Sequence, residues 1–213
     1  MKAFSFLKNR VFWLFLVVSF TAKVDAQTFE KPEFKNPRLF LSYSTMHTNV
    51  LGQGAGMRSI SGGITWDELF TTGVNYYYIR SNIYRNFDET PHKLNLTYYN
   101  ALTKYKLSLY NKMVFQVGLE TGPGQAYYDG GNSQGVQKSH YFWNVTGLFD
   151  AYYKMLPWFG FGGEVGYRAV AFSELKLSGV LLNIKLKFFP LQFYQIIKKN
   201  PADLLQPEPL EFD

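Results

Sequence analysis

The sequence contains no cysteine. Disulfide bonds, thiolate metal sites, cysteine nucleophiles and a lipoprotein anchor are therefore all excluded. A large excess of positive or negative charge is also absent. The formal net charge is +6, and the first 26 residues contribute +3 of it, with four basic residues against one acidic. The remaining +3 is too small to indicate a nucleic-acid partner.

Long apolar runs are missing as well. The longest, residues 11–20, has ten residues, of which Ser19 alone is polar, whereas a membrane-spanning helix needs about 20. It follows a basic start and precedes small residues at Val24 and Ala26. This pattern predicts a signal peptide over residues 1–26, cleaved after Ala26, and then a short periplasmic segment, residues 27–37. A chain without spanning helices is either soluble or crosses the membrane as a closed barrel.

Aromatic residues, in contrast, are abundant. The chain has 16 Tyr, 20 Phe and 4 Trp, which together make 19% of it. Strands favour aromatic residues, and membrane barrels add girdles of them at both interfaces. The composition therefore favours an all-β membrane protein.

Apolar and polar residues alternate with a period of two in eight segments, as expected for strands with one apolar face. The clearest is residues 179–189, where Val180, Leu182 and Ile184 oppose Asn183 and Lys185. In residues 93–110 the apolar positions change parity, which indicates a bulge or a strand that starts above the membrane. A soluble sandwich can show the same alternation and stays open as an alternative. The other segments are residues 38–44, 60–67, 70–80, 113–120, 140–155 and 159–172.

The connections between these segments differ in length. Tight turns are expected near Glu68, Asn111 and Pro157, and longer loops over residues 49–56, 82–92 and 129–139. The last hairpin, near residue 173, is expected to be shorter. Short turns on one side and long loops on the other are typical of bacterial barrels. An even number of strands places both ends of the barrel on the periplasmic side.

Residues 38–189 resemble the superfamily of small eight-stranded outer-membrane β-barrels, of the OmpA/OmpX kind. The high usage of Tyr, Phe and Asn is similar to that of members from Bacteroidota. The resemblance implies an antiparallel up-and-down transmembrane barrel located in the outer membrane. The sequence departs from the family at its end. Such barrels usually stop at the aromatic end of the last strand, whereas residues 190–213 follow here.

The alternation assigns one set of charged residues to the lumen of the barrel. Eight strands enclose an interior just wide enough to be filled by side chains. We therefore predict a packed polar network of ion pairs, with a narrow cation-lined path for small anions as the alternative. The predicted lumen residues are Lys104, Lys106, Glu120, Asp150, Lys154, Glu164, Arg168, Lys185 and Lys187.

Some barrels of this size are lipid A-modifying enzymes that use Ser, His and an acid near the external rim. The three histidines, His47, His92 and His140, fall near predicted strand ends on that side. Ser139 and His140 are adjacent, so their side chains point to opposite faces, which is poor geometry for a nucleophile and its base. We predict no catalytic residue, no metal site and no cofactor.

The C-terminal tail, residues 190–213, is the stronger functional candidate. Its first part is expected to form a short amphipathic turn on the inner membrane surface, and its Pro-rich remainder to be extended. A disordered tail is the alternative. We predict an anchor or accessory subunit of a larger envelope complex, with outer-membrane lipid and an outer-membrane or periplasmic protein as partners. A small-solute pore and a lipid-modifying enzyme are the other hypotheses. The predicted tail contacts are Phe193, Tyr194, Leu204, Leu205, Leu210 and Phe212.

Overall fold

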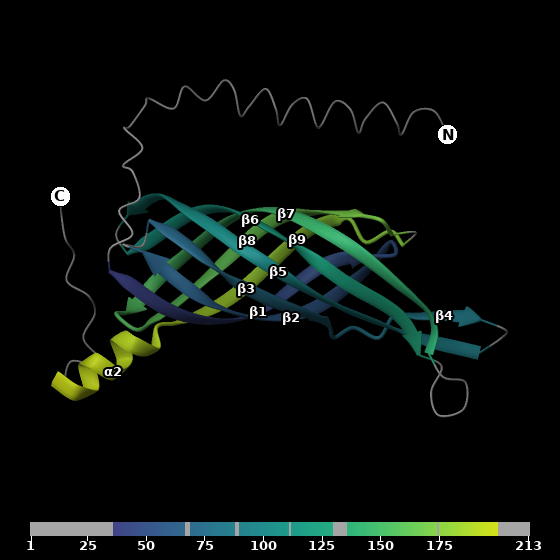
Figure 1. Cartoon of the computed structure of the whole chain (residues 1–213), viewed down its shortest axis with the longest axis horizontal. Helices are drawn as coiled ribbons and strands as arrows, with labels where there is room; N and C mark the ends of the chain where they lie inside the picture. Colours follow the sequence, from purple (N-terminus) through teal and green to yellow (C-terminus); the bar gives the residue numbers. More distant parts are fainter. Residues whose placement is uncertain are drawn as a thin grey trace, which may run out of the picture. The chain divides into compact units, whose positions relative to one another are not determined.

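The computed structural model describes residues 36–66, 69–87, 90–110, 112–129, 136–173 and 175–199 (Figure 1). The predicted signal peptide, the N-terminal segment up to residue 35 and the tail from residue 200 onward lie outside the described residues. Leu204, Leu205, Leu210 and Phe212 are therefore not placed by the structure.

Eight long antiparallel strands form a closed ring in the described part of the chain. Each strand pairs with its neighbour in sequence, and β1 pairs with β9 to close the ring. A ninth strand, β4, is a short addition to the start of β5. The predicted up-and-down barrel is thus confirmed. The strands are β1 (Pro37–Val50), β2 (Gln53–Trp66), β3 (Phe70–Ile79), β4 (Tyr84–Phe87), β5 (Thr90–Tyr110), β6 (Met113–Asp129), β7 (Val136–Leu156), β8 (Phe159–Ala171) and β9 (Gly179–Phe188).

The wall of the barrel separates an apolar outer surface from a mixed interior. On β9 the exposed positions are Val180, Leu182, Ile184 and Leu186, and the residues between them are buried. Because successive side chains of a strand point to opposite faces, the same division runs through β7 and β8. The alternation read from the sequence is the alternation between these two faces.

In residues 93–110 the apolar positions switch from even to odd numbers, but the face that points into the barrel does not switch. Leu94, Leu96 and Lys104 are all buried inside the barrel, and even-numbered residues point inward from residue 94 to residue 104. The interior itself changes, from apolar at the start of β5 to charged further along. A bulge does occur, between Lys106 and Ser108.

One end of the barrel carries β4 and the connections after β1 and β8 (Figure 1); we call it the hairpin end. The predicted loop over residues 49–56 is instead a two-residue turn, because β1 and β2 run on to Val50 and Gln53. Leu51 and Gly52 both have positive φ, 55° and 80°, as the favoured two-residue hairpin turn requires. The Leu51 N–H donates to the Lys176 carbonyl (2.9 Å), which helps to hold this uncommon conformation.

The last hairpin is longer than predicted. Residues 172–178 connect β8 to β9, and Leu175 and Leu177 of this connection are buried in the mouth of the barrel. The Ser178 hydroxyl accepts from the Val170 N–H (3.0 Å), which ties the connection to the end of β8. This segment closes the hairpin end from within.

The opposite end of the barrel carries helix α2, Pro190–Lys199, and we call it the helix end (Figure 1). The strands meet here in short connections, among them Pro157–Trp158 between β7 and β8. No helix among the described residues has the length and apolar character needed to cross a membrane.

Two glycines test how tightly adjacent strands approach each other. A Cβ on Gly122 would lie 1.9 Å from the Tyr99 carbonyl oxygen, where β5 and β6 lose their pairing. A Cβ on Gly147, on the outer surface of β7, would meet nothing within 4 Å. The same chemical change therefore has opposite consequences at the two positions.

We expect Gly122→Ala to destabilise the barrel and Gly147→Ala to leave it unchanged. Overpacking usually costs about 1–3 kcal/mol, and a clash with rigid backbone lies at or above the top of that range. Folding is measured by the difference in gel migration between unheated and boiled samples, and stability by urea unfolding. Equal stability of the two variants would contradict the close approach at Gly122.

Candidate functional site in the barrel interior

The interior at the hairpin end is an apolar core. Its members come from seven strands and from the connections after β3 and β8. Ile83, Leu175 and Leu177, which belong to those connections, are each 9% exposed or less. A core of this kind excludes water from the mouth of the barrel. The buried cluster comprises Met46, Val50, Ala55, Met57, Tyr77, Ile83, Leu94, Leu96, Tyr98, Ala126, Tyr128, Phe142, Leu175, Leu177 and Leu181.

Arg168 lies next to this core, on the side towards the middle of the barrel, and is fully buried. Its Nε donates to the Leu177 carbonyl (2.9 Å) and its Nη1 to the Tyr98 hydroxyl (3.0 Å). Tyr98 also stacks on Tyr77, with ring centroids 4.4 Å apart. Arg168 therefore holds the inward-folded connection and the wall of the barrel together.

Glu120 is held by neutral donors in the next layer. Its carboxylate accepts from the Asn75 amide (3.1 Å), the Tyr77 hydroxyl (2.7 Å) and the Asn100 amide (3.2 Å). Asn100 and Asn144 exchange two further hydrogen bonds, at 3.0 Å and 2.9 Å. A buried carboxylate is costly unless such donors satisfy it. Four strands, β3, β5, β6 and β7, are connected through this group.

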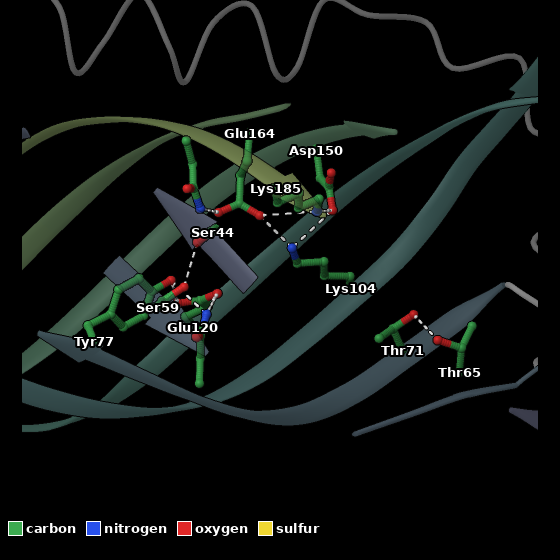
Figure 2. Close-up of polar contacts among 12 residues, drawn as sticks. Ser44, Ser59, Thr65, Thr71, Tyr77, Lys104, Glu120, Asp150, Glu164 and Lys185 are labelled. Atoms are coloured by element: carbon green, nitrogen blue, oxygen red, sulfur yellow. Dashed lines mark hydrogen bonds and ion pairs between the residues drawn. The ribbon is translucent and has the colours of Figure 1, made fainter. Parts of the chain in front are cut away.

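Four charged side chains form a compact cluster in the middle of the interior (Figure 2). Lys104 lies 3.0 Å from Asp150 Oδ2 and also donates to Glu164. Lys185 donates to Asp150 and lies 3.6 Å from Glu164. All four side chains are at most 8% exposed. Two positive and two negative charges balance, so the cluster is electrically neutral.

Small hydroxyl side chains of β1, β2 and β3 face this cluster. Ser44 and Ser59 share a hydrogen bond of 2.6 Å, and Thr65 and Thr71 one of 3.0 Å (Figure 2). These short residues leave space that the long lysines of β5 and β9 fill. The remaining cavity measures about 20 Å³, and a water molecule needs roughly 10–15 Å³.

An aromatic group closes the interior at the helix end. The Lys187 ammonium lies 4.9 Å from the ring centre of Phe40, 4.5 Å from Tyr152 and 5.2 Å from Phe189. Cations are attracted to aromatic faces at about this range. Phe40 and Phe189 also pack with Leu102 in a second buried apolar cluster. The charged layer is thus enclosed by apolar groups at both ends.

The structure brings together some of the predicted lumen residues and separates others. Lys104, Asp150, Glu164 and Lys185 meet in one cluster, whereas Glu120, Arg168 and Lys187 each have their own partners. Lys154 is buried, and Lys106 is half-buried beside the bulge of β5. Glu164 and Arg168 do not pair with each other, although they lie on one face of β8.

Sequence reasoning missed the residues that close the two ends. Leu175 and Leu177 were assigned to a short loop, and Phe40 and Phe189 to no site. Asn75, Asn100 and Tyr77 were missed as well. The alternation along β3 and β5 could have found them. Asn75 and Tyr77 lie on the same face of β3 as Thr71, and Asn100 lies on the same face of β5 as Lys104, so all three are expected to point into the lumen.

The three histidines do not form a shared site in the structure. His47 is exposed on β1, His92 is fully buried on β5 and His140 is half-buried on β7. His92 lies beside the apolar core of the hairpin end, next to Leu94 along the strand. Among the described residues, no group of three or more His, Asp and Glu side chains is placed to hold a metal ion.

This closed ring with a filled interior has the fold of the small eight-stranded outer-membrane β-barrels. No family model and no curated protein matches the sequence. Solved structures do match, with TM-scores of 0.54 for neisserial surface protein A and 0.49 for Ail, the attachment invasion locus protein of Yersinia pestis, bound to the heparin analogue sucrose octasulfate. They are 15% and 11% identical in sequence, and in each case the match covers 72% of this chain and 96% of the other.

The N-terminal β-barrel domain of Pseudomonas aeruginosa OprF matches with a TM-score of 0.42 and 12% identity, covering 72% of this chain and 98% of that chain. The match to neisserial surface protein A is a similarity of fold.

We expect Asp150→Asn to destabilise the barrel by about 3–5 kcal/mol, because removing one partner of a buried pair leaves charge uncompensated. Here the variant deprives two lysines of a carboxylate. Urea unfolding, followed by tryptophan fluorescence, measures the change. The control is Lys176→Gln on the exposed connection at the hairpin end, where surface substitutions usually stay within about 0.5 kcal/mol. Similar unfolding midpoints for the two variants would refute a structural role of the cluster.

Proposed function

We propose that this protein is an exported, non-enzymatic outer-membrane barrel that serves as an anchor or accessory subunit of a larger cell-envelope complex. The observation that carries the proposal is the combination of an apolar outer wall and an interior closed at both ends. A protein built in this way offers its partners the surfaces outside the barrel. The resemblance to outer-membrane barrels supports the location.

The outer wall has the character that a lipid environment requires. Large apolar side chains stay exposed along β7, β8 and β9, among them Phe149, Val165 and Ile184. Exposed apolar surface on this scale marks an interaction surface and not a water-facing one. In a closed ring every strand has two neighbours, so the backbone polar groups of the wall are satisfied without water.

Aromatic residues lie at both ends of this wall. Trp66 stacks with Phe70 towards the helix end, and Tyr76 packs against Tyr78 and Tyr99 towards the hairpin end. Such belts are typical of the two membrane interfaces. The helix end, which carries both ends of the barrel, would face the periplasm after export through a signal peptide.

The contents of the interior argue against a solute pore. The four-charge cluster fills the middle, while the apolar core and the aromatic group of Phe40, Tyr152 and Phe189 lie on either side of it. An ion on this route would have to displace the cluster and cross apolar layers. The tail beyond α2, with Leu204, Leu205, Leu210 and Phe212, is then the segment proposed to contact a protein partner.

The tail is tested by substitution within the full chain. Serine at Leu204, Leu205, Leu210 and Phe212 removes the proposed apolar contacts, and we expect the co-purifying proteins to be lost after gentle detergent extraction. The matched control, Glu208→Gln with Glu211→Gln, changes charge in the same segment and should retain them. Heat-dependent gel migration checks that both barrels fold. Unchanged partners in the serine variant would overturn the tail as the contact.

Planar bilayers test the closed interior directly. The purified, folded protein should give no stepwise conductance, because the charged cluster and both apolar closures block the route. A porin inserted under the same conditions serves as the positive control. Reproducible single-channel steps from this protein would refute a filled lumen and favour the pore.

A further inference from the structure

We propose that helix α2 lies flat in the periplasmic headgroup layer of the membrane and binds phospholipid with an apolar face. This inference rests on the proposed membrane location. It concerns the helix alone and not the protein partner of the tail. The occupant to which we commit is a lipid surface.

Helix α2 is attached to the outer side of the barrel rim. Phe188 is in phase with the exposed positions of β9, and Phe193 of the helix packs on its ring, with centroids 5.6 Å apart. Trp158, in the turn between β7 and β8, contacts the same two rings at 5.8 Å and 5.1 Å. The helix is therefore joined to the face that meets lipid, whereas the neighbouring Phe189 points into the barrel.

The helix leaves an apolar strip uncovered, which ends at Lys198 on its C-terminal side. At 100° per residue, Ile197, Tyr194 and Leu191 follow Phe193 around the helix, and these three are 43%, 62% and 42% exposed. Gln195 lies on the side opposite Phe193, and the exposed Lys198 falls between Tyr194 and Leu191 in this projection, about one turn beyond Tyr194 towards the C-terminal end of the helix. Exposed apolar residues beside Phe193, which packs on the barrel, extend the apolar outer surface of the wall onto the helix.

Polar and basic residues complete the pattern of an interfacial helix. Such helices bury an apolar face in the boundary between headgroups and acyl chains and keep Lys or Arg on the polar side. Lys198 and Lys199 end this helix, and its first turn carries no acidic residue. Two cations at the C-terminus also complement the helix dipole. Anionic phospholipid headgroups are the favoured contacts of these lysines.

A membrane explains the exposed strip better than a protein partner does. The strip lies beside Phe193, which packs on Phe188 at the end of the outer face of β9. The proposed function places that face in lipid, and a partner at this position would have to displace the lipid. The helix begins two residues after β9 ends. It has little freedom to leave the plane of the rim.

The absence of cysteine allows a test by site-directed spin labelling of the full chain. Single cysteines replace Tyr194 on the apolar strip or Gln195 on the polar side, and nitroxide is attached to each. The labelled proteins are refolded into vesicles of phosphatidylethanolamine and phosphatidylglycerol. Accessibility is then measured to oxygen, which concentrates in lipid, and to a nickel chelate, which stays in water. We expect the ratio of oxygen to nickel accessibility to be several-fold higher at position 194 than at 195.

A third label, at Ile184 in the middle of β9, tests the membrane location of the barrel separately from the interfacial position of α2. An Ile184→Cys label accessible to oxygen places the barrel in lipid, and a water-accessible label there would refute the membrane location itself. With Ile184 in lipid, equal nickel accessibility at 194 and 195 would overturn the interfacial helix alone. Shielding of 194 from both reagents would also overturn it, in favour of a protein cover. Heat-dependent migration confirms that each labelled barrel is folded.

Discussion

Closure of the sheet through β1 and β9 is the constraint on which the rest of the structure depends. This seam runs from the pair Leu41–Phe188 to the pair Thr48–Leu181. Without it two strands would carry unpaired N–H and C=O groups, which a hydrocarbon environment does not tolerate. Eight strands closed in this way define an interior that side chains can fill completely. Everything inside the barrel follows from the need to fill that space.

The interior meets this need with layers of different chemistry. From the hairpin end to the helix end, the layers are an apolar core, an arginine bound to neutral groups, a carboxylate held by amides and a tyrosine, a balanced four-charge cluster and an aromatic closure. Buried charge adds little net stability by itself, because desolvation offsets attraction. Its value here is geometric: Lys104, Asp150, Glu164 and Lys185 come from four different strands. Only one strand register brings them together.

Much of the fold could be predicted from period-two patterning because the outer wall must be apolar along its whole height. The segments on β7, β8 and β9 were clear for this reason, and their charged positions proved to be interior. Patterning failed where both faces carry apolar residues. At the start of β5, Leu94 and Leu96 point inward into a core, so their apolar character was misread as a change of face.

The partners inside the barrel could not be predicted in the same way. Alternation tells which face of the strand a residue occupies. It does not tell how far along the barrel axis the residue lies relative to residues on other strands, because that position depends on the strand register. Lys104 and Lys106 look equivalent in the sequence, yet only Lys104 contacts the cluster, because Lys106 lies two residues further along β5, opposite Gln116 and next to the bulge. The inward fold of Leu175 and Leu177 depends on Arg168 and on the Leu51 N–H, and no local pattern announces such contacts.

The position of this inward fold has a consequence for the order of assembly. Leu175 and Leu177 belong to the hairpin that joins β8 to β9, and β9 is the strand that completes the seam with β1. The connection that closes the mouth and the strand that closes the ring thus lie in one segment, the last part of the barrel to be synthesised. A chain halted at the end of β8 would lack both at once and would show an unpaired edge beside an uncovered apolar core. Completion of the ring and sealing of its mouth are a single event.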